Sequence, residues 1–158
     1  MFRESFPILA LCLSLAASTA VEAKDIAKTV AYLVQGKTAA EVYDFIKTKS
    51  PRVAGNATFA FTMIATKTDK KEKKSADACG YSSFKTSAIF NYVIPRHTNA
   101  EALKPKTRTK WHAFEGYLKV HEQGHRDIWL RCFAEYDAAA KALSARDCKA
   151  LDKQRENA

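Results

Sequence analysis

The sequence predicts an α+β fold, in which a small and mainly antiparallel β-sheet is combined with an N-terminal helix and a long C-terminal helix. Residues 29–94 contain several segments of strand-forming residues, with one short helical segment after the first of them. Residues 107–143 contain no proline and repeat apolar residues at helical spacing. The resulting order of strand, helix, two or three strands and long helix favours helices that are segregated from an antiparallel sheet.

The beginning of the chain has the pattern of an export signal. One base, Arg3, precedes an apolar run, and small residues then place a cleavage site after Ala20 or after Ala23. The run is shorter than the ~20 residues that a membrane-spanning helix needs, and no later segment approaches that length. We therefore expect a signal peptide over residues 1–23 and a single domain over residues 24–158, located in the periplasm or outside the cell.

The start of the expected domain reads as a strand followed by a short helix. Residues 29–35 are rich in strand formers. Thr38 and Glu41 are spaced as in a capping box, in which two side chains satisfy free backbone N–H groups at the start of a helix. The helix should end near Ser50, because Pro51 disfavours helical backbone in the residue before it.

The middle of the chain reads as strands joined by a charged loop. Residues 57–66 alternate in part between apolar and polar, which predicts a half-buried strand. The side chains expected on its apolar side are those of Phe59, Phe61, Met63 and Ala65. Residues 67–78 contain a run of lysines, and we expect them to form a solvated loop. Residues 81–94 predict one or two further strands that end at Pro95.

A long amphipathic helix dominates the C-terminal half. Thr98 and Glu101 form a second capping signature, which predicts a helix of one or two turns before Pro105. The long helix is expected to begin near Thr107 and to reach Leu143. At about 100° per residue, its apolar side chains and the two histidines of the motif described below form one stripe about 100° wide, which we expect to be buried. The members of this stripe are Trp111, Phe114, Leu118, His121, His125, Ile128, Cys132, Tyr136, Ala139 and Leu143.

Within that helix, His121-Glu122-Gln123-Gly124-His125 fits the H-E-x-x-H pattern. The spacing places His125 about 40° round the helix from His121, so both imidazoles can bind one metal ion, and Glu122 lies beside its open position. A lone histidine on an apolar stripe is more often a hydrogen-bonded core residue, but two histidines with this glutamate are harder to explain by packing. We predict that His121 and His125 hold Zn²⁺, and that Glu122 acts as the general base that deprotonates a metal-activated water.

The sequence identifies no third protein ligand. Asp127 lies about 200° round the helix from His125, so it can support the ligands or lie at the surface but cannot bind the same ion. Glu135 lies about 15 Å beyond His125 along the helix, and His112 points away from His121. The other side chains considered, none of which is favoured, are His97, Glu41, Asp44, Asp147 and Asp152.

Three cysteines follow the expected cleavage site, and an oxidising compartment outside the cytoplasm favours a disulfide between two of them. Cys132 lies in the long helix and Cys148 just after it, so a Cys132–Cys148 bridge would hold the tail against the helix. The alternative is a bridge between Cys79 and Cys132, with Cys148 left over. No C-x-x-C spacing supports a zinc–thiolate site.

The balance of charge is basic. The formal net charge is +9, and it becomes +10 when residues 1–23 are removed with Arg3, Glu4 and Glu22. Such a surface favours contact with anionic envelope polymers or anionic lipids. No motif that interleaves basic and aromatic residues for nucleic-acid binding occurs, so we expect no nucleic-acid partner.

Taken in combination, these features resemble the bacterial DUF922 family, which is described as predicted secreted zinc-dependent proteases. The features that carry the resemblance are residues 32–38 with Glu41, the Ile94-Pro95 strand end, Trp111, and the H-E-x-x-H motif followed by Asp127. The resemblance extends from about Tyr32 to Cys148. It implies a single zincin-like metallopeptidase domain.

The sequence therefore supports three functions of different classes. The leading hypothesis is an exported zinc metallopeptidase that acts on a peptide or protein substrate, with Glu122 as its catalytic base. The second is a non-catalytic basic envelope-binding protein, in which the metal site is structural or degenerate. The third is metal-dependent hydrolysis of an amide that is not a peptide, for example in the cell wall.

Overall fold

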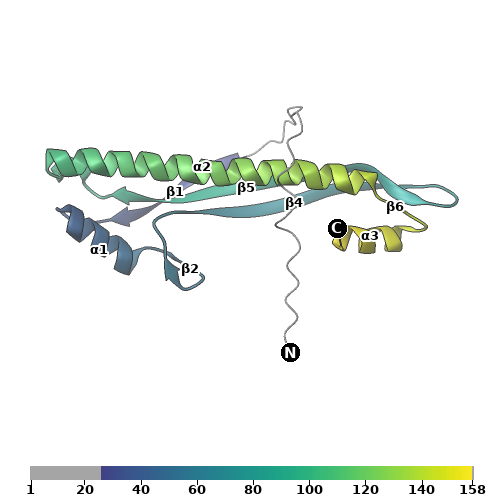
Figure 1. The fold of residues 1–158 in the computed structure, drawn as a ribbon, viewed down its shortest axis with the longest axis horizontal. Coiled ribbons are helices and arrows are strands. Elements are labelled where there is room, and N and C mark those ends of the chain that lie inside the picture. The colour runs from purple at the N-terminus through teal and green to yellow at the C-terminus, as the bar shows by residue number, and fades with distance from the viewer. Residues whose placement is uncertain (1–25, 158) are drawn as a thin grey trace.

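The computed structural model describes residues 26–157 and confirms the α+β class. The elements in chain order are β1 (Ile26–Val34), α1 (Ala39–Lys49), β2 (Arg52–Val53), β3 (Asn56–Ala57), β4 (Phe61–Lys74), β5 (Cys79–His97), the 3₁₀ helix η1 (Ala100–Ala102), α2 (Pro105–Ala142), β6 (Ser144–Ala145) and α3 (Cys148–Glu156). Helix α2 lies along the long strands, and α1 lies at one end of them (Figure 1), where Val42 and Ile46 of α1 form a buried cluster with Trp111 of α2. The export signal expected over residues 1–23 lies outside the described residues.

Strand β5 is the centre of the main sheet, which has the order β1-β5-β4. Strand β1 pairs with β5 in parallel, whereas β4 and the short β6 pair with it in antiparallel orientation. Alternate residues of β5 face α2, and Phe90 and Tyr92 form a buried cluster there with Leu118 of the helix. The sheet is therefore mixed, with antiparallel pairing in the long β4–β5 hairpin and in β6.

The prediction of a charged loop over residues 67–78 is wrong for most of that segment. Strand β4 continues to Lys74, and its ladder with β5 runs from Phe61↔Val93 to Lys74↔Cys79. The lysines are tolerated because the residues of β4 from Lys67 to Lys74 are all exposed and their side chains stay hydrated, whereas Tyr81 and Phe84 of β5 supply the buried contacts of this arm. Ion pairs such as Lys67–Asp69 also lie on the arm.

The prediction of which side of β4 is buried is also wrong. Met63 is 52% exposed, whereas Thr62 and Ile64 lie opposite Tyr92 and Phe90 on the face that α2 covers. Because side chains alternate along a strand, the position of the helix decides which set is buried. The more apolar set is the one that faces away from α2.

Strand β5 continues through Pro95 instead of ending there. Its last residues pair with β1, including Tyr32↔Pro95 and Val34↔His97. Strand β4 begins at Phe61, opposite Val93, so no residue of β4 lies opposite the proline. The N–H group that proline lacks is therefore not needed for that ladder.

Local signals set the ends of the helices. Thr38 is the N-cap of α1, and its hydroxyl accepts a hydrogen bond from the Glu41 backbone N–H at 3.3 Å. The Glu41 carboxylate accepts from the Lys37 backbone N–H at 2.7 Å, which confirms the predicted capping pair with a shift of one residue. The N-cap of η1 is Asn99 and not Thr98. Helix α2 begins at Pro105, because proline suits the first helical position.

The disulfide joins Cys79 to Cys148, with an S–S distance of 1.99 Å, so both pairings predicted through Cys132 are wrong. Cys132 lies on α2, which continues for ten more residues to Ala142 before the chain turns. The chain then forms β6 beside the start of β5, where Ala145 pairs with Cys79. This pairing brings the first residue of α3, Cys148, to the sheet instead of to the helix.

Candidate metal centre

The H-E-x-x-H residues lie in the middle of α2. The helix contacts the sheet both before and after the motif. Helix α2 is continuous over 38 residues. After the motif, the Asp137 carboxylate accepts hydrogen bonds from the backbone N–H (2.9 Å) and the hydroxyl (2.7 Å) of Thr86 in β5. Before the motif, Leu118 packs in the cluster that contains Phe90. The backbone of the motif is therefore held in place by neighbouring turns.

The two histidines lie next to each other at the surface of α2. The His121 and His125 side chains are exposed, and their Nε2 atoms are 3.2 Å apart. The rings are perpendicular, with 4.8 Å between their centroids, and Tyr117 stacks on His121 one turn earlier. The two nitrogens therefore point toward the same point in space.

This arrangement fits a zinc ion. Two nitrogens at about 2.0–2.1 Å from one tetrahedral Zn²⁺ lie about 3.3–3.4 Å apart. The 3.2 Å between the His121 and His125 nitrogens is close to that value. The same distance also permits a hydrogen bond between the rings when one nitrogen carries a proton. The spacing of the imidazole pair is thus suited to a metal ion.

Glu122 is the buried member of the motif, with a residue exposure of 2%. Its Oε2 atom accepts a hydrogen bond of 2.6 Å from the hydroxyl of Thr62 on β4. Nevertheless, one ligand atom from each of His121, Glu122 and His125 lies within 4.8 Å of the others. A buried carboxylate costs free energy unless hydrogen bonds or a cation compensate it. The carboxylate is thus placed beside a point where a cation would be favourable.

Within residues 26–157, no fourth metal-ligating side chain joins this group. His97 is buried, its Nε2–H donates to the Gly36 carbonyl, and its Nδ1 accepts from the Asn99 backbone N–H. Glu41 caps α1, and Asp147 caps α3. Asp152 binds Lys70 and Tyr81, and His112 lies by Glu115. These side chains, which the sequence offered as third ligands, therefore have other partners. Asp44 also lies outside the group of His121, Glu122 and His125.

The prediction that both histidines lie on the buried stripe of the helix is wrong. The buried residues of α2 are Trp111, Leu118, Glu122 and Ala140. Taking His121 as zero, these residues lie at about 60–100° round the helix, whereas the histidines lie at about 0–40°. The helix packs mainly along the single strand β5, so only a narrow stripe is covered. The histidines lie on the flank of this stripe, where they are exposed to solvent.

The comparisons with known proteins identify one family. Residues 29–158 match the family described as "Bacterial protein of unknown function (DUF922)". The chain belongs to this family. No curated protein and no solved structure matches it. In the part of this DUF922 protein that the structure describes, no helix is long and apolar enough to cross a membrane.

Thr62 is the site residue of this DUF922 domain that sequence reasoning missed. It lies 60 residues before Glu122 and belongs to no motif. Its side chain faces α2 because it is opposite Tyr92 in the β4–β5 ladder. Only the pairing of the two strands could have placed it under the helix.

Basic and acidic side chains follow the motif on the other flank of α2. The Arg126 guanidinium donates to the Asp127 carboxylate at 2.8 Å, which raises the pKa of Arg126 above its ordinary value. The Tyr92 side chain adds a smaller contribution in the same direction. Asp127 is therefore an ion-paired surface residue. This is one of the two roles predicted from its helical position, the other being support of the metal ligands.

Proposed function

We propose that this DUF922 protein is an exported zinc-dependent metallopeptidase. The observation that carries the proposal is the 3.2 Å spacing of the His121 and His125 Nε2 atoms beside the Glu122 carboxylate. The two imidazoles would hold the ion. When bound, Zn²⁺ supplies a Lewis acid that polarises a carbonyl group and makes water more acidic.

In this proposal the protein residues position the substrate and transfer the proton. Glu122 takes a proton from the attacking water and passes it to the amine that leaves. The Thr62 hydroxyl holds Oε2 of Glu122, so proton transfer falls to the second oxygen of the carboxylate. Burial of the side chain keeps its orientation fixed, which favours catalysis because no reorganisation is needed during the reaction.

The Cys79–Cys148 disulfide supports the exported location. Disulfides persist in oxidising compartments such as the periplasm and are rare in reducing ones. The bridge joins the start of β5 to α3, away from the H-E-x-x-H residues of α2. It therefore stabilises the fold and takes no part in the proposed reaction.

The test compares matched pairs of variants on the same helix. Purified protein should contain about one zinc per chain and cleave an unstructured protein substrate, as expected for a zinc hydrolase. His121→Ala should lose the metal, whereas His112→Ala, nine residues earlier and also exposed, should keep it. Glu122→Gln should keep the metal and lose cleavage, whereas Glu115→Gln should keep both. The expected loss in Glu122→Gln is at least about 100-fold, the usual contribution of a general base.

Two results would contradict the assignment. Full cleavage by Glu122→Gln would show that another group moves the proton. Loss of zinc in Glu122→Gln would show that this carboxylate is a ligand and not the base. Metal content is measured by atomic emission and cleavage by release of fluorescence from a labelled protein.

A second function is favoured by the β4–β5 arm. Lys67, Lys71, Lys73 and Lys74 are all exposed on β4, and the arm extends beyond the ends of the other strands (Figure 1). A non-catalytic protein that binds anionic envelope polymers would use this surface. Its retention on such a polymer should weaken with salt and with Lys→Gln changes at these four positions, and should not change in His121→Ala.

A further inference from the structure

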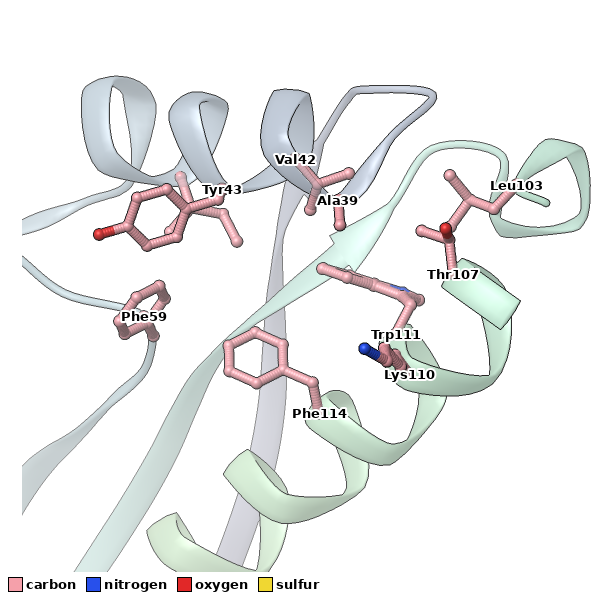
Figure 2. A pocket seen from close by; sticks show the side chains of 10 residues that line it. Ala39, Val42, Tyr43, Phe59, Leu103, Thr107, Lys110, Trp111 and Phe114 are labelled. Carbon is pink, nitrogen blue, oxygen red and sulfur yellow. The ribbon is translucent and has the colours of Figure 1, made fainter. Parts of the chain in front are cut away.

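We propose that the cavity between α1 and the start of α2 binds a large apolar side chain of the peptide substrate, an inference that rests on the proposed peptidase function. The cavity has a volume of about 240 Å³. It is lined mainly by apolar side chains, and Figure 2 shows those of α1 on one side and those of α2 on the other, with Phe59 at one end. A dry apolar cavity of about 150 Å³ is sufficient for benzene, so this one can hold an aromatic or large aliphatic side chain.

The cavity exists because the two long strands are of unequal length. Strand β5 continues to His97, but β4 begins only at Phe61, opposite Val93. Helices α1 and α2 flank the part of the sheet that β4 leaves uncovered. Trp111 lies against this space, and its indole N–H is buried and has no hydrogen-bond partner within residues 26–157.

The cavity lies on the same side of α2 as the histidines. Phe114, which lines it, is seven residues before His121, which corresponds to about 20° round the helix and about 10 Å along it. Phe59, which also lines it, is three residues before Thr62, or about 10 Å along an extended chain. The two aromatic rings are in contact, with 5.6 Å between their centroids. Both routes therefore place the cavity about 10 Å from the metal centre.

The open edge of β4 suits a peptide in an extended conformation. Strand β4 pairs only with β5 in the described sheet, so its outer edge is open beside Thr62. An extended peptide can add to such an edge through backbone hydrogen bonds. At about 3.3 Å per residue, a distance of 10 Å corresponds to three residues. We therefore expect the bound side chain to belong to the second or third residue from the cleaved bond. Lys110 at the rim favours an acidic neighbour.

Trp111 provides a direct assay of binding. The chain contains two tryptophans, and Trp129→Phe leaves Trp111 as the only one. In this background with Glu122→Gln, an extended peptide that contains one phenylalanine should change the Trp111 emission in a saturable way. The same peptide with glycine at that position should bind at least about tenfold more weakly, because the buried ring is missing. Binding should persist with a chelator present, since the cavity is remote from the histidines.

Two neighbouring alanines give a matched pair of variants. Ala39 and Ala40 are both exposed, but only Ala39 lines the cavity. Ala39→Phe should fill the cavity and abolish the Trp111 response, and Ala40→Phe should leave it unchanged, with circular dichroism to confirm that both variants are folded. An equal response of the phenylalanine and glycine peptides, or of the two variants, would overturn the proposal.

A cleavage experiment separates this inference from the proposed function. With a peptide mixture, the active protein should prefer a large apolar residue at one fixed position, two or three residues from the cut, and Ala39→Phe should remove the preference. Cleavage without any such preference would overturn the cavity assignment and leave the peptidase intact. A Trp111 response in the binding assay, together with no cleavage by the protein that keeps Glu122, would support the cavity and refute the peptidase.

Discussion

The hydrogen bond from Thr62 to Glu122 connects β4 to the motif helix, and a double-mutant cycle can measure its strength. Thr62→Val removes the hydroxyl at nearly constant volume. Glu122→Met removes the carboxylate and keeps an unbranched side chain of similar length. The free energies of unfolding of the wild type, the two single variants and the double variant are measured by urea denaturation in the presence of a chelator, so that bound metal does not contribute.

The magnitude follows from the structure. The donor–acceptor distance is 2.6 Å and Glu122 is 2% exposed, so water competes weakly for the carboxylate. A hydrogen bond to a charged group contributes about 1.5–3 kcal/mol, and we expect a coupling free energy in this range. Thr62→Val alone should lower the free energy of unfolding by about 2–3 kcal/mol, because it leaves a buried charge without its donor.

Thr66→Val is the matched control, since Thr66 lies on the same face of β4, opposite Ala88, but is exposed. This control should change the free energy of unfolding by less than about 0.5 kcal/mol. A coupling free energy below about 0.5 kcal/mol in the cycle, the scatter for independent sites, would refute the role given to Thr62.

Three further predictions concern the fold around the site. Replacing Cys79 and Cys148 together by serine opens a loop with a sequence separation of 69 residues and should lower the free energy of unfolding by about 2–4 kcal/mol in urea denaturation. The hydrogen bond from Lys70 holds the pKa of Asp152 below its ordinary value of 3.8, so its stabilisation is complete above pH 3.8 and is lost as the pH falls through the lower folded-state value. Asp152→Asn should therefore reduce the urea midpoint at pH 7, and the difference should vanish on acidification. Gly124→Ala should raise the free energy of unfolding by about 0.5–1 kcal/mol, because the added Cβ meets nothing within 4 Å.

The parts of the fold that could be predicted are those that depend on neighbours in the sequence. The capping pair Thr38 and Glu41 acts within one turn, and Pro51 acts on the residue before it, so the bounds of α1 were predicted to within a residue. The long helix was predicted by its period and by the absence of proline, and only the suitability of Pro105 for the first turn was overlooked. The spacing of His121 and His125 also depends on one helix alone.

Most of the wrong predictions depend on partners that are distant in the sequence. Residues 67–74 form a strand because β5 lies beside them, and their own composition favours a loop. Cys148 reaches Cys79 because β6 pairs with the start of β5, which no local pattern reveals. The exposure of the histidines depends on how narrow a stripe of α2 the sheet covers. Long-range pairing therefore decides the environment of the motif, although it does not decide its internal geometry.

The burial of Glu122 connects the stability of this fold to its proposed chemistry. A buried carboxylate with its donor is often no more stabilising than a well-packed apolar pair, so the double variant Thr62→Val/Glu122→Met should be at least as stable as the wild type without metal. If so, Thr62 and Glu122 are not explained by stability alone. Zinc should then stabilise the wild type more than the double variant, which keeps both histidines but has no negative charge next to the ion. Equal stabilisation of both proteins by zinc would show that the Glu122 carboxylate, on the buried side of α2, does not contribute to metal binding through its charge.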